Sequence, residues 1–128
     1  MKIHGQRFRA LPSLYAVCRL SPDAAVPGWA SGPFVNITFT DDELAIICPE
    51  AQVPAGIRAE RDWRVLKLVG PFPFTATGVL ASLAAPLARA GISLLSIATY
   101  DTDFLLVKQD VLEDAIAVLV AAGHTKIG

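Results

Sequence analysis

Two segments of the chain match each other at a constant spacing of 60 positions, and this duplication constrains the fold most strongly. Residues 37–47 (ITFTDDELAII) align on residues 97–107 (IATYDTDFLLV) without a gap. Each segment has an apolar strand, an acidic turn and an apolar return strand, which is the pattern of a β-hairpin. Chance similarity between two such segments is the alternative. A true repeat predicts two copies of one supersecondary unit.

A similar strand precedes each hairpin segment. Residues 15–20 (YAVCRL) resemble residues 63–68 (WRVLKL), with an aromatic residue first and a basic residue fifth. Between this strand and the hairpin, the first copy has only residues 21–33, whose three prolines leave room for one or two helical turns. A second helix near residues 51–60 is predicted to be short because it contains Pro54. The first copy is therefore a shortened unit.

The second copy begins with a strand and a helix. Residues 63–69 (WRVLKLV) are rich in β-branched and aromatic residues and are bounded by a Gly-Pro pair, which favours a strand. Apolar residues then recur at helical spacing over residues 79–87, and Gly91 is predicted to end this helix. Pro86 removes one backbone donor and should kink the last turn.

The rest of the second copy continues the same alternation. Residues 92–100 predict a strand, and residues 103–108 return antiparallel after a tight turn. Residues 110–113 (DVLE) predict a capping box at the start of a second helix, which Gly123 ends. Residues 124–127 can add a short final strand. The order β-α-β-β-α-β is that of the ferredoxin-like split unit.

These patterns predict an α+β fold of two tandem ferredoxin-like units, with antiparallel sheets and helices on one face. We expect a shortened N-terminal unit over residues 1–62 and a complete unit over residues 63–128. Residues 63–69 can also end the first unit while they begin the second. Residues 2–9 could form an edge strand.

Composition narrows the classes of partner. Hydrophobic residues make up 53% of the chain and charged residues 18%, with a net charge of −1. No basic face is rich enough to bind nucleic acid, and no apolar stretch reaches the roughly 18 residues of a membrane span. The N-terminal residues lack the apolar core of a signal peptide, so we expect a cytoplasmic protein. So much apolar surface in a small domain predicts a homodimer.

Catalytic chemistry has few candidate residues. Cys18 and Cys48 lie in apolar runs and are predicted to be buried free thiols, with a disulfide or a nucleophile as the alternative. His4 and His124 have no partner acid pattern and are predicted to lie on the surface. The sequence has no catalytic triad order, zinc motif or phosphate loop. We therefore expect no enzyme, no cofactor and no metal site.

Residues 70–108 (GPFPFTATGVLASLAAPLARAGISLLSIATYDTDFLLVK) closely resemble the small ACT-domain proteins related to the regulatory region of aspartate kinases and to the cytosolic arginine sensor. NITFTDDELAIICPE and the Val53-Pro54 that follows match the companion unit of the same proteins. The resemblance covers about residues 11–124, with the motif pieces in order and at family spacing.

The resemblance implies a regulatory, allosteric module. It implies tandem ACT units, assembly as a homodimer and binding of an amino acid at an interface between units, without identifying the amino acid. A chain that is only an ACT tandem would act through a regulated protein partner or a change of oligomer. A structural or oligomerisation module without a small ligand is the alternative.

A loop over residues 74–78 leads into the first helix of the second unit and is one half of the predicted ligand site. Free backbone N–H groups at a helix start, here near Gly78 and Val79, favour an anion such as an α-carboxylate. Thr75 and Thr77 can add hydroxyl donors. The alternative is that a threonine caps the helix and the glycine eases packing.

The hairpin turn at residues 99–103 (TYDTD) is the other half. Its carboxylates can pair with an α-ammonium, and a solvated turn is the alternative. The arginine sensor has a ligand-contacting aspartate in the equivalent hairpin, which makes Asp103 the preferred acid, with Glu43 as its predicted counterpart in the first copy. Ile97, Thr99 and Thr102 complete the predicted site. We expect both halves to meet across a seam between units and hold a zwitterion.

Overall fold

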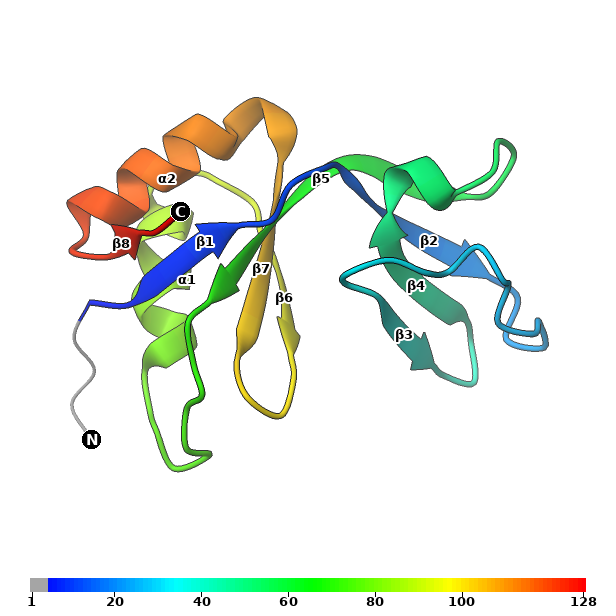
Figure 1. The fold of residues 1–128 in the computed structure, drawn as a ribbon, viewed down its shortest axis with the longest axis horizontal. Coiled ribbons are helices and arrows are strands. Elements are labelled where there is room, and N and C mark those ends of the chain that lie inside the picture. Colours follow the sequence, from blue (N-terminus) through cyan, green and yellow to red (C-terminus); the bar gives the residue numbers. More distant parts are fainter. Residues whose placement is uncertain (1–4) are drawn as a thin grey trace. The chain divides into compact units, whose positions relative to one another are not determined.

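The computed structural model describes residues 5–128 and divides the chain into two units (Figure 1). The N-terminal unit is Ser13–Trp63, and the C-terminal unit combines residues 5–12 with Arg64–Gly128. The predicted division between residues 62 and 63 lies next to this boundary, but residues 5–12 fold with the C-terminal unit. The predicted α+β class is confirmed.

One strand serves both units. Strand β5 (Ala59–Leu68) runs across the boundary between Trp63 and Arg64. Its first half pairs with β2 (Tyr15–Leu20) of the N-terminal unit, and its second half pairs with β1 (Arg7–Ala10) and β7 (Asp103–Lys108) of the C-terminal unit. β5 is therefore the last strand of one unit and the first of the other.

The N-terminal unit is a four-stranded antiparallel sheet in the order β3-β4-β2-β5. β3 (Asn36–Phe39) and β4 (Leu44–Pro49) form the predicted hairpin. The short helix predicted near residues 51–60 is wrong: a single 3-10 turn, η1 (Glu50–Gln52), occupies its start, and β5 already begins at Ala59.

A loop takes the place of helices over this sheet. One face buries Ala16, Cys18, Leu44, Ile46 and Cys48. Partly buried side chains from the long β2–β3 loop pack on this face, among them Trp29, Ala30 and Val35. Cys18 and Cys48 are buried free thiols, as predicted. Burial raises the pKa of both thiols, that of Cys48 to about 11.

The C-terminal unit has two helices and a five-stranded sheet in the order β6-β7-β5-β1-β8 (Figure 1). Its remaining elements follow in chain order: α1 (Val79–Arg89), β6 (Leu95–Ala98), η2 (Gln109–Val111), α2 (Leu112–Ala121) and β8 (Thr125–Lys126). The expected edge strand is wrong for the described residues, because β1 lies between β5, antiparallel, and β8, parallel.

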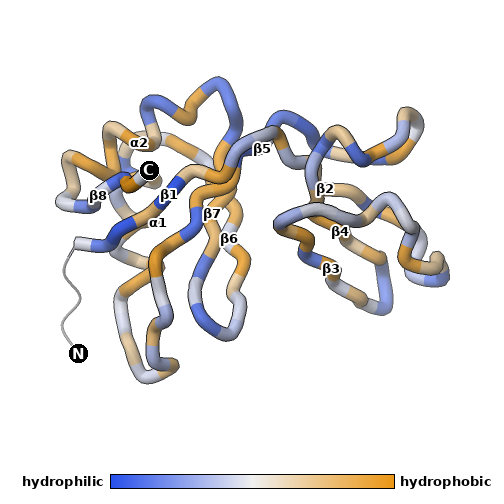
Figure 2. The backbone as a smooth tube through the Cα atoms, in the orientation of Figure 1, coloured by the Kyte–Doolittle hydropathy of each residue, from blue (hydrophilic) through white to orange (hydrophobic). Residues whose placement is uncertain are grey.

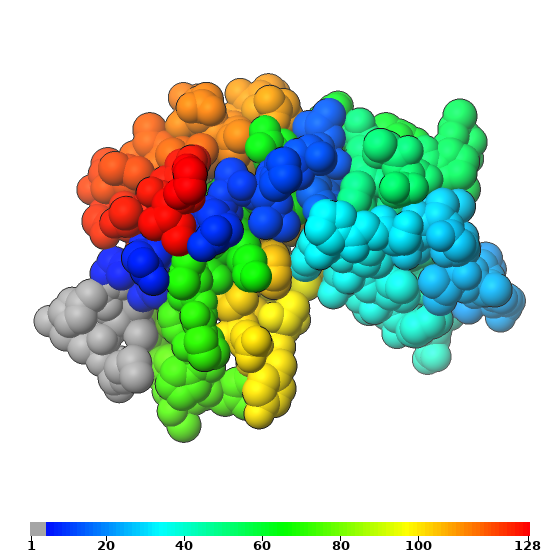
Figure 3. Space-filling model, in the orientation of Figure 1, coloured from blue at the N-terminus to red at the C-terminus, as the bar shows by residue number. Residues whose placement is uncertain are grey.

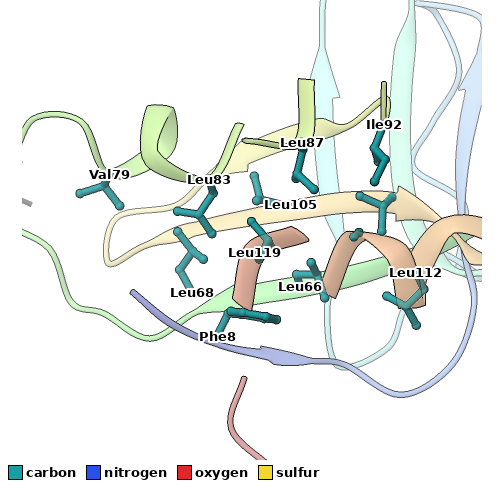
Figure 4. Packing of buried hydrophobic residues seen from close by; sticks show 12 residues of the cluster. Phe8, Leu66, Leu68, Val79, Leu83, Leu87, Ile92, Leu105, Leu112 and Leu119 are labelled. Atoms are coloured by element: carbon teal, nitrogen blue, oxygen red, sulfur yellow. The ribbon is translucent and has the colours of Figure 1, made fainter. Parts of the chain in front are cut away.

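The core of the C-terminal unit lies between its sheet and the two helices (Figure 4). Leu83 and Leu87 of α1 and Leu112 and Leu119 of α2 are buried together with strand residues. The strand residues of this cluster are Phe8, Leu66, Leu68, Leu105 and Val107. The i, i+2 spacing on each of β5 and β7 puts their residues on one face of the sheet. On β7 the four consecutive apolar residues 104–107 are all buried, and Figure 2 shows the hydropathy of each residue along the tube.

Both helices end as predicted but neither begins as predicted. Gly91 and Gly123 have positive φ, and each donates its N–H three residues back, to Ala88 and Val120 respectively. The predicted threonine cap of α1 is wrong: Gly78 is the N-cap, with φ 78°, and no side chain caps the helix. The predicted capping box at residues 110–113 is also wrong, because the 3-10 turn η2 lies there and Val111 precedes α2 without a side-chain cap.

The surface position predicted for His124 is wrong, since its side chain is only 5% exposed. Its Nδ1 accepts a hydrogen bond from the Gln6 N–H at 2.9 Å, which leaves Nε2–H to donate to the Ser82 carbonyl at 2.9 Å. The ring thus joins the N-terminal segment to α1. His4 lies outside the described residues.

Among residues 5–128, no helix combines the length and the apolar character that crossing a bilayer requires.

Candidate functional site

The loop before α1 is fixed to the β6–β7 turn by backbone hydrogen bonding. The Phe72 N–H donates to the Asp101 carbonyl at 2.8 Å, and within the loop the Ala76 N–H donates to the Pro73 carbonyl at 2.9 Å. Gly70 permits this approach, because a Cβ there would lie 2.7 Å from the Asp101 carbonyl oxygen. The loop and the turn lie side by side at the surface, green and yellow in Figure 3.

The β6–β7 turn is closed by its own threonines. The N–H and the Oγ1 of Thr99 both donate to the Thr102 carbonyl at 2.9 Å. The buried Thr102 hydroxyl donates in turn to the Leu68 carbonyl at 3.0 Å. The turn is therefore fixed to strand β5, and the half-buried Asp103 follows immediately at the start of β7.

A cavity of about 230 Å³ lies between this loop, the first residue of α1 and the hairpin turn. Four of the predicted site residues line it: Val79, Thr99, Thr102 and Asp103. The start of α1 and the acidic hairpin turn thus line one cavity within the C-terminal unit. The expected seam between units is not needed to form this cavity.

The other four predicted residues do not line the cavity. Thr75, Thr77 and Gly78 are exposed on the loop, and Ile97 is half-buried on β6, two residues before the turn. Gly78 is the N-cap of α1, and the next residue, Val79, lines the cavity.

Sequence reasoning missed the aromatic residues of the cavity. Phe72, Phe74 and Tyr100 line it together with the second acid, Asp101. The rings of Phe74 and Tyr100 meet edge to face with centroids 5.0 Å apart, although the residues are 77% and 82% exposed. Tyr100 in an otherwise polar hairpin turn could have indicated a binding surface, since aromatic side chains bury large apolar areas.

The two sides of the cavity differ in charge. Asp101 and Asp103 supply carboxylates on the hairpin side. On the other side, the first N–H groups of α1 have no side-chain acceptor, and the helix dipole makes this end positive. Complementary groups on one small molecule, an ammonium and a carboxylate, fit this arrangement.

The first-copy hairpin reproduces the turn with a different register from the one predicted. The Thr40 N–H and Oγ1 donate to the Glu43 carbonyl at 3.0 and 3.2 Å, the same pattern that joins Thr99 to Thr102. Thr40 thus corresponds to Thr99 and Glu43 to Thr102, one residue off the alignment of the sequences. The prediction that Glu43 is the counterpart of Asp103 is wrong: Leu44 stands at that place.

The arrangement of the C-terminal unit, with two helices over a sheet of split β-α-β connections, defines a ferredoxin-like class of domain. A family model described as the ACT domain matches residues 58–121, and the chain belongs to this family. The resemblance drawn from residues 70–108 is thereby confirmed. A second family model, described as an N-terminal domain, matches residues 13–56.

Solved structures share the fold of this chain. A protein of Agobacterium tumefaciens is 38% identical, with a TM-score of 0.92, covering 98% of this chain and 94% of its own. A Vibrio cholerae protein of unknown function, described as a possible transport protein, is 20% identical, with a TM-score of 0.76 and coverage of 93% and 91%.

The regulatory subunit of aspartate kinase from Thermus thermophilus, in a ligand-free form, is 12% identical, with a TM-score of 0.58 and coverage of 86% and 93%. This likeness, like that to the Vibrio protein, concerns the fold alone. A comparison with curated proteins gives no match.

Proposed function

We propose that the chain is a regulatory module that binds a free amino acid in the cavity of its C-terminal unit. The observation that carries the proposal is the pairing, in one cavity, of Asp103 with the uncapped start of α1. The cavity volume of about 230 Å³ lies below the roughly 300–1,000 Å³ of pockets for drug-sized ligands, which suits a small metabolite.

The α-ammonium of the ligand pairs with the hairpin acids. Asp103 is half-buried, so a charge-assisted hydrogen bond there is less screened than at an exposed site. Asp101 is exposed and adds negative charge at the entrance. The Thr102–Leu68 hydrogen bond fixes the turn, which keeps Asp103 in place before a ligand arrives.

The α-carboxylate lies at the start of α1. Helix N-termini bind anions through free N–H groups and the dipole together. Val79, the first residue of the helix, lines the cavity. The exposed Phe74–Tyr100 pair at the same cavity offers ring surface to the ligand side chain.

Regulation follows from differential affinity. A ligand shifts an equilibrium between two packings only as far as it binds one better than the other. We expect the packings to be those of a homodimer, and the output to be a regulated protein partner, in the cytoplasm. Catalysis forms no part of this role.

A thermal-shift panel of the proteinogenic amino acids on the purified full chain tests the proposal. One or a few should raise the melting temperature, since ligand at about a hundred times its Kd adds roughly 2.7 kcal/mol. Asp103→Asn should abolish the rise, whereas Asp110→Asn, the same change at an exposed residue of η2, should leave it intact. A chain indifferent to every amino acid would instead be the ligand-free structural module.

A further inference from the structure

A second hollow, in the N-terminal unit, is lined by residues of β2, the start of β5 and the β3–β4 turn. Its volume is about 240 Å³. Residues of opposite charge line it: Arg19, Arg58, Glu43 and Glu60. Val17 and Ala59 add apolar surface between them. None of these residues belongs to the C-terminal cavity.

Two arginines, Arg19 and Arg58, line this hollow from neighbouring strands. The Arg19 N–H donates to the Arg58 carbonyl at 2.9 Å, one step beyond the Cys18–Ala59 pair of the β2–β5 ladder. Directly opposed residues of antiparallel strands project to the same face, where like charges destabilise each other. Glu60 projects to this same face, opposite Val17, and also lines the hollow. A carboxylate bound by both arginines would accept charge-assisted hydrogen bonds from them.

The two arginines are not equally engaged. Arg19 Nη2 donates to the Asp42 carbonyl at 2.9 Å, which holds its side chain toward the β3–β4 turn. The guanidinium of Arg58 makes no hydrogen bond or ion pair with any residue of 5–128. Arg58 therefore carries donors that a carboxylate can take up.

Glu43 supplies the opposite charge. Its backbone is fixed, because the Thr40 hydroxyl accepts from the Glu43 N–H at 3.0 Å and the Thr40 N–H donates to the Glu43 carbonyl at 3.0 Å. Its half-buried carboxylate has no hydrogen-bond or ionic partner within the described part of the chain. The half-buried Glu43 and the exposed Arg58 thus line one hollow.

The equivalent hollow of the C-terminal unit is lined by polar groups that already have partners within the chain. There Lys67 stands in the place of Arg19 and Thr102 in that of Glu43, around a hollow of about 190 Å³. Lys67 Nζ lies 5.8 Å from the centre of the Phe104 ring, and the Thr102 hydroxyl donates to the Leu68 carbonyl. Polar groups without partners among the residues that the structure describes, the Arg58 guanidinium and the Glu43 carboxylate, are therefore found in the hollow of the N-terminal unit.

We propose that the hollow of the N-terminal unit is a second site for a small zwitterion of the α-amino-acid class. The carboxylate lies between Arg19 and Arg58, and the ammonium pairs with Glu43. The site does not require the C-terminal cavity to bind anything, so each proposal can fail alone.

Amide NMR spectra of the full chain, recorded during titration with each proteinogenic amino acid at millimolar concentration, test this site. At least one amino acid should shift the amides of Arg19, Glu43 and Arg58. Arg58→Gln should weaken that affinity about tenfold or more, as expected for the loss of a charge-assisted hydrogen bond. Arg89→Gln, the same loss of charge on α1, should leave the affinity unchanged.

Several results would overturn the proposal. The first is that no amino acid of the panel shifts those three amides. The second is that Arg58→Gln binds the amino acid as tightly as the wild type. The third is that acetate binds as tightly as the amino acid, since acetate has no ammonium for Glu43. Should Arg58→Gln perturb the sheet amides generally, Glu43→Gln takes its place with the same expectation. The amides of Val79 and Asp103 report the C-terminal cavity separately in the same spectra.

Discussion

The rings of Phe74 and Tyr100 meet edge to face, with centroids 5.0 Å apart, across the gap between the loop before α1 and the β6–β7 turn. Both side chains are largely exposed. Exposed aromatic residues at a small cavity cost little stability when removed but supply contact area to a ligand. Substitutions in this pair should therefore change ligand affinity more than they change the free energy of unfolding.

Tyr100→Ala should weaken amino-acid binding while leaving stability nearly unchanged. Loss of the ring pair costs about 0.5–1.5 kcal/mol at most, because the rings are mainly in solvent. Calorimetric titration gives the affinity, and urea unfolding gives the free energy of unfolding. Phe39→Ala, at another exposed aromatic residue on β3, is the matched control and should not change binding. Equal affinity in wild type and Tyr100→Ala would exclude the aromatic pair from the site.

Thr102→Val should lower the free energy of unfolding by about 1–3 kcal/mol, because the buried hydroxyl that donates to the Leu68 carbonyl is lost without a change of shape. Thr102→Ser keeps the hydroxyl and should retain most of the stability. Denaturant unfolding of the three proteins checks the ranking. If valine proved as stable as threonine, this hydrogen bond would not be what fixes the turn.

Gly70→Ala should displace the hairpin turn. The added Cβ would lie 2.7 Å from the Asp101 carbonyl oxygen and 3.0 Å from Thr102 Cβ, and both neighbours are constrained. We expect a loss of about 1–3 kcal/mol of stability together with weaker ligand binding. Gly28→Ala is the control, since nothing lies within 4 Å of its added Cβ. Unfolding curves that coincide for both variants would contradict the close approach.

The buried thiols make stability depend on alkaline pH. Burial, with a smaller contribution from Cys18, raises the pKa of Cys48 from 9.0 to about 11. The folded chain therefore holds its proton where the unfolded chain releases it, so stability is full below pH 9 and falls as the pH rises toward about 11. Denaturant unfolding across this range should show the fall, with a smaller slope in Cys48→Ala. An unchanged slope in that variant would assign the fall to other groups.

Sequence patterns predicted the strands and helices that local residue spacing controls. Tyr15–Leu20 has the bounds predicted for it, and the apolar spacing over residues 79–87 located α1. Period-two and helical periodicities act within a single element, which is why they can be read without tertiary contacts.

Features that depend on distant contacts were not predictable in the same way. The burial of His124 depends on Gln6 and Ser82, which are far from it in the sequence. The interior position of β1 depends on β8, more than a hundred residues later. The one-residue shift between the two hairpins follows from their threonine hydrogen bonds, which an ungapped alignment of similar residues cannot reveal.

A crystal structure of the full chain grown with the amino acid that most raises its melting temperature tests the central claim most directly. The account predicts a bound amino acid in the C-terminal cavity, with its ammonium within hydrogen-bond distance of the Asp103 carboxylate and its carboxylate facing the first N–H groups of α1. The same amino acid bound elsewhere, with this cavity empty, would contradict it.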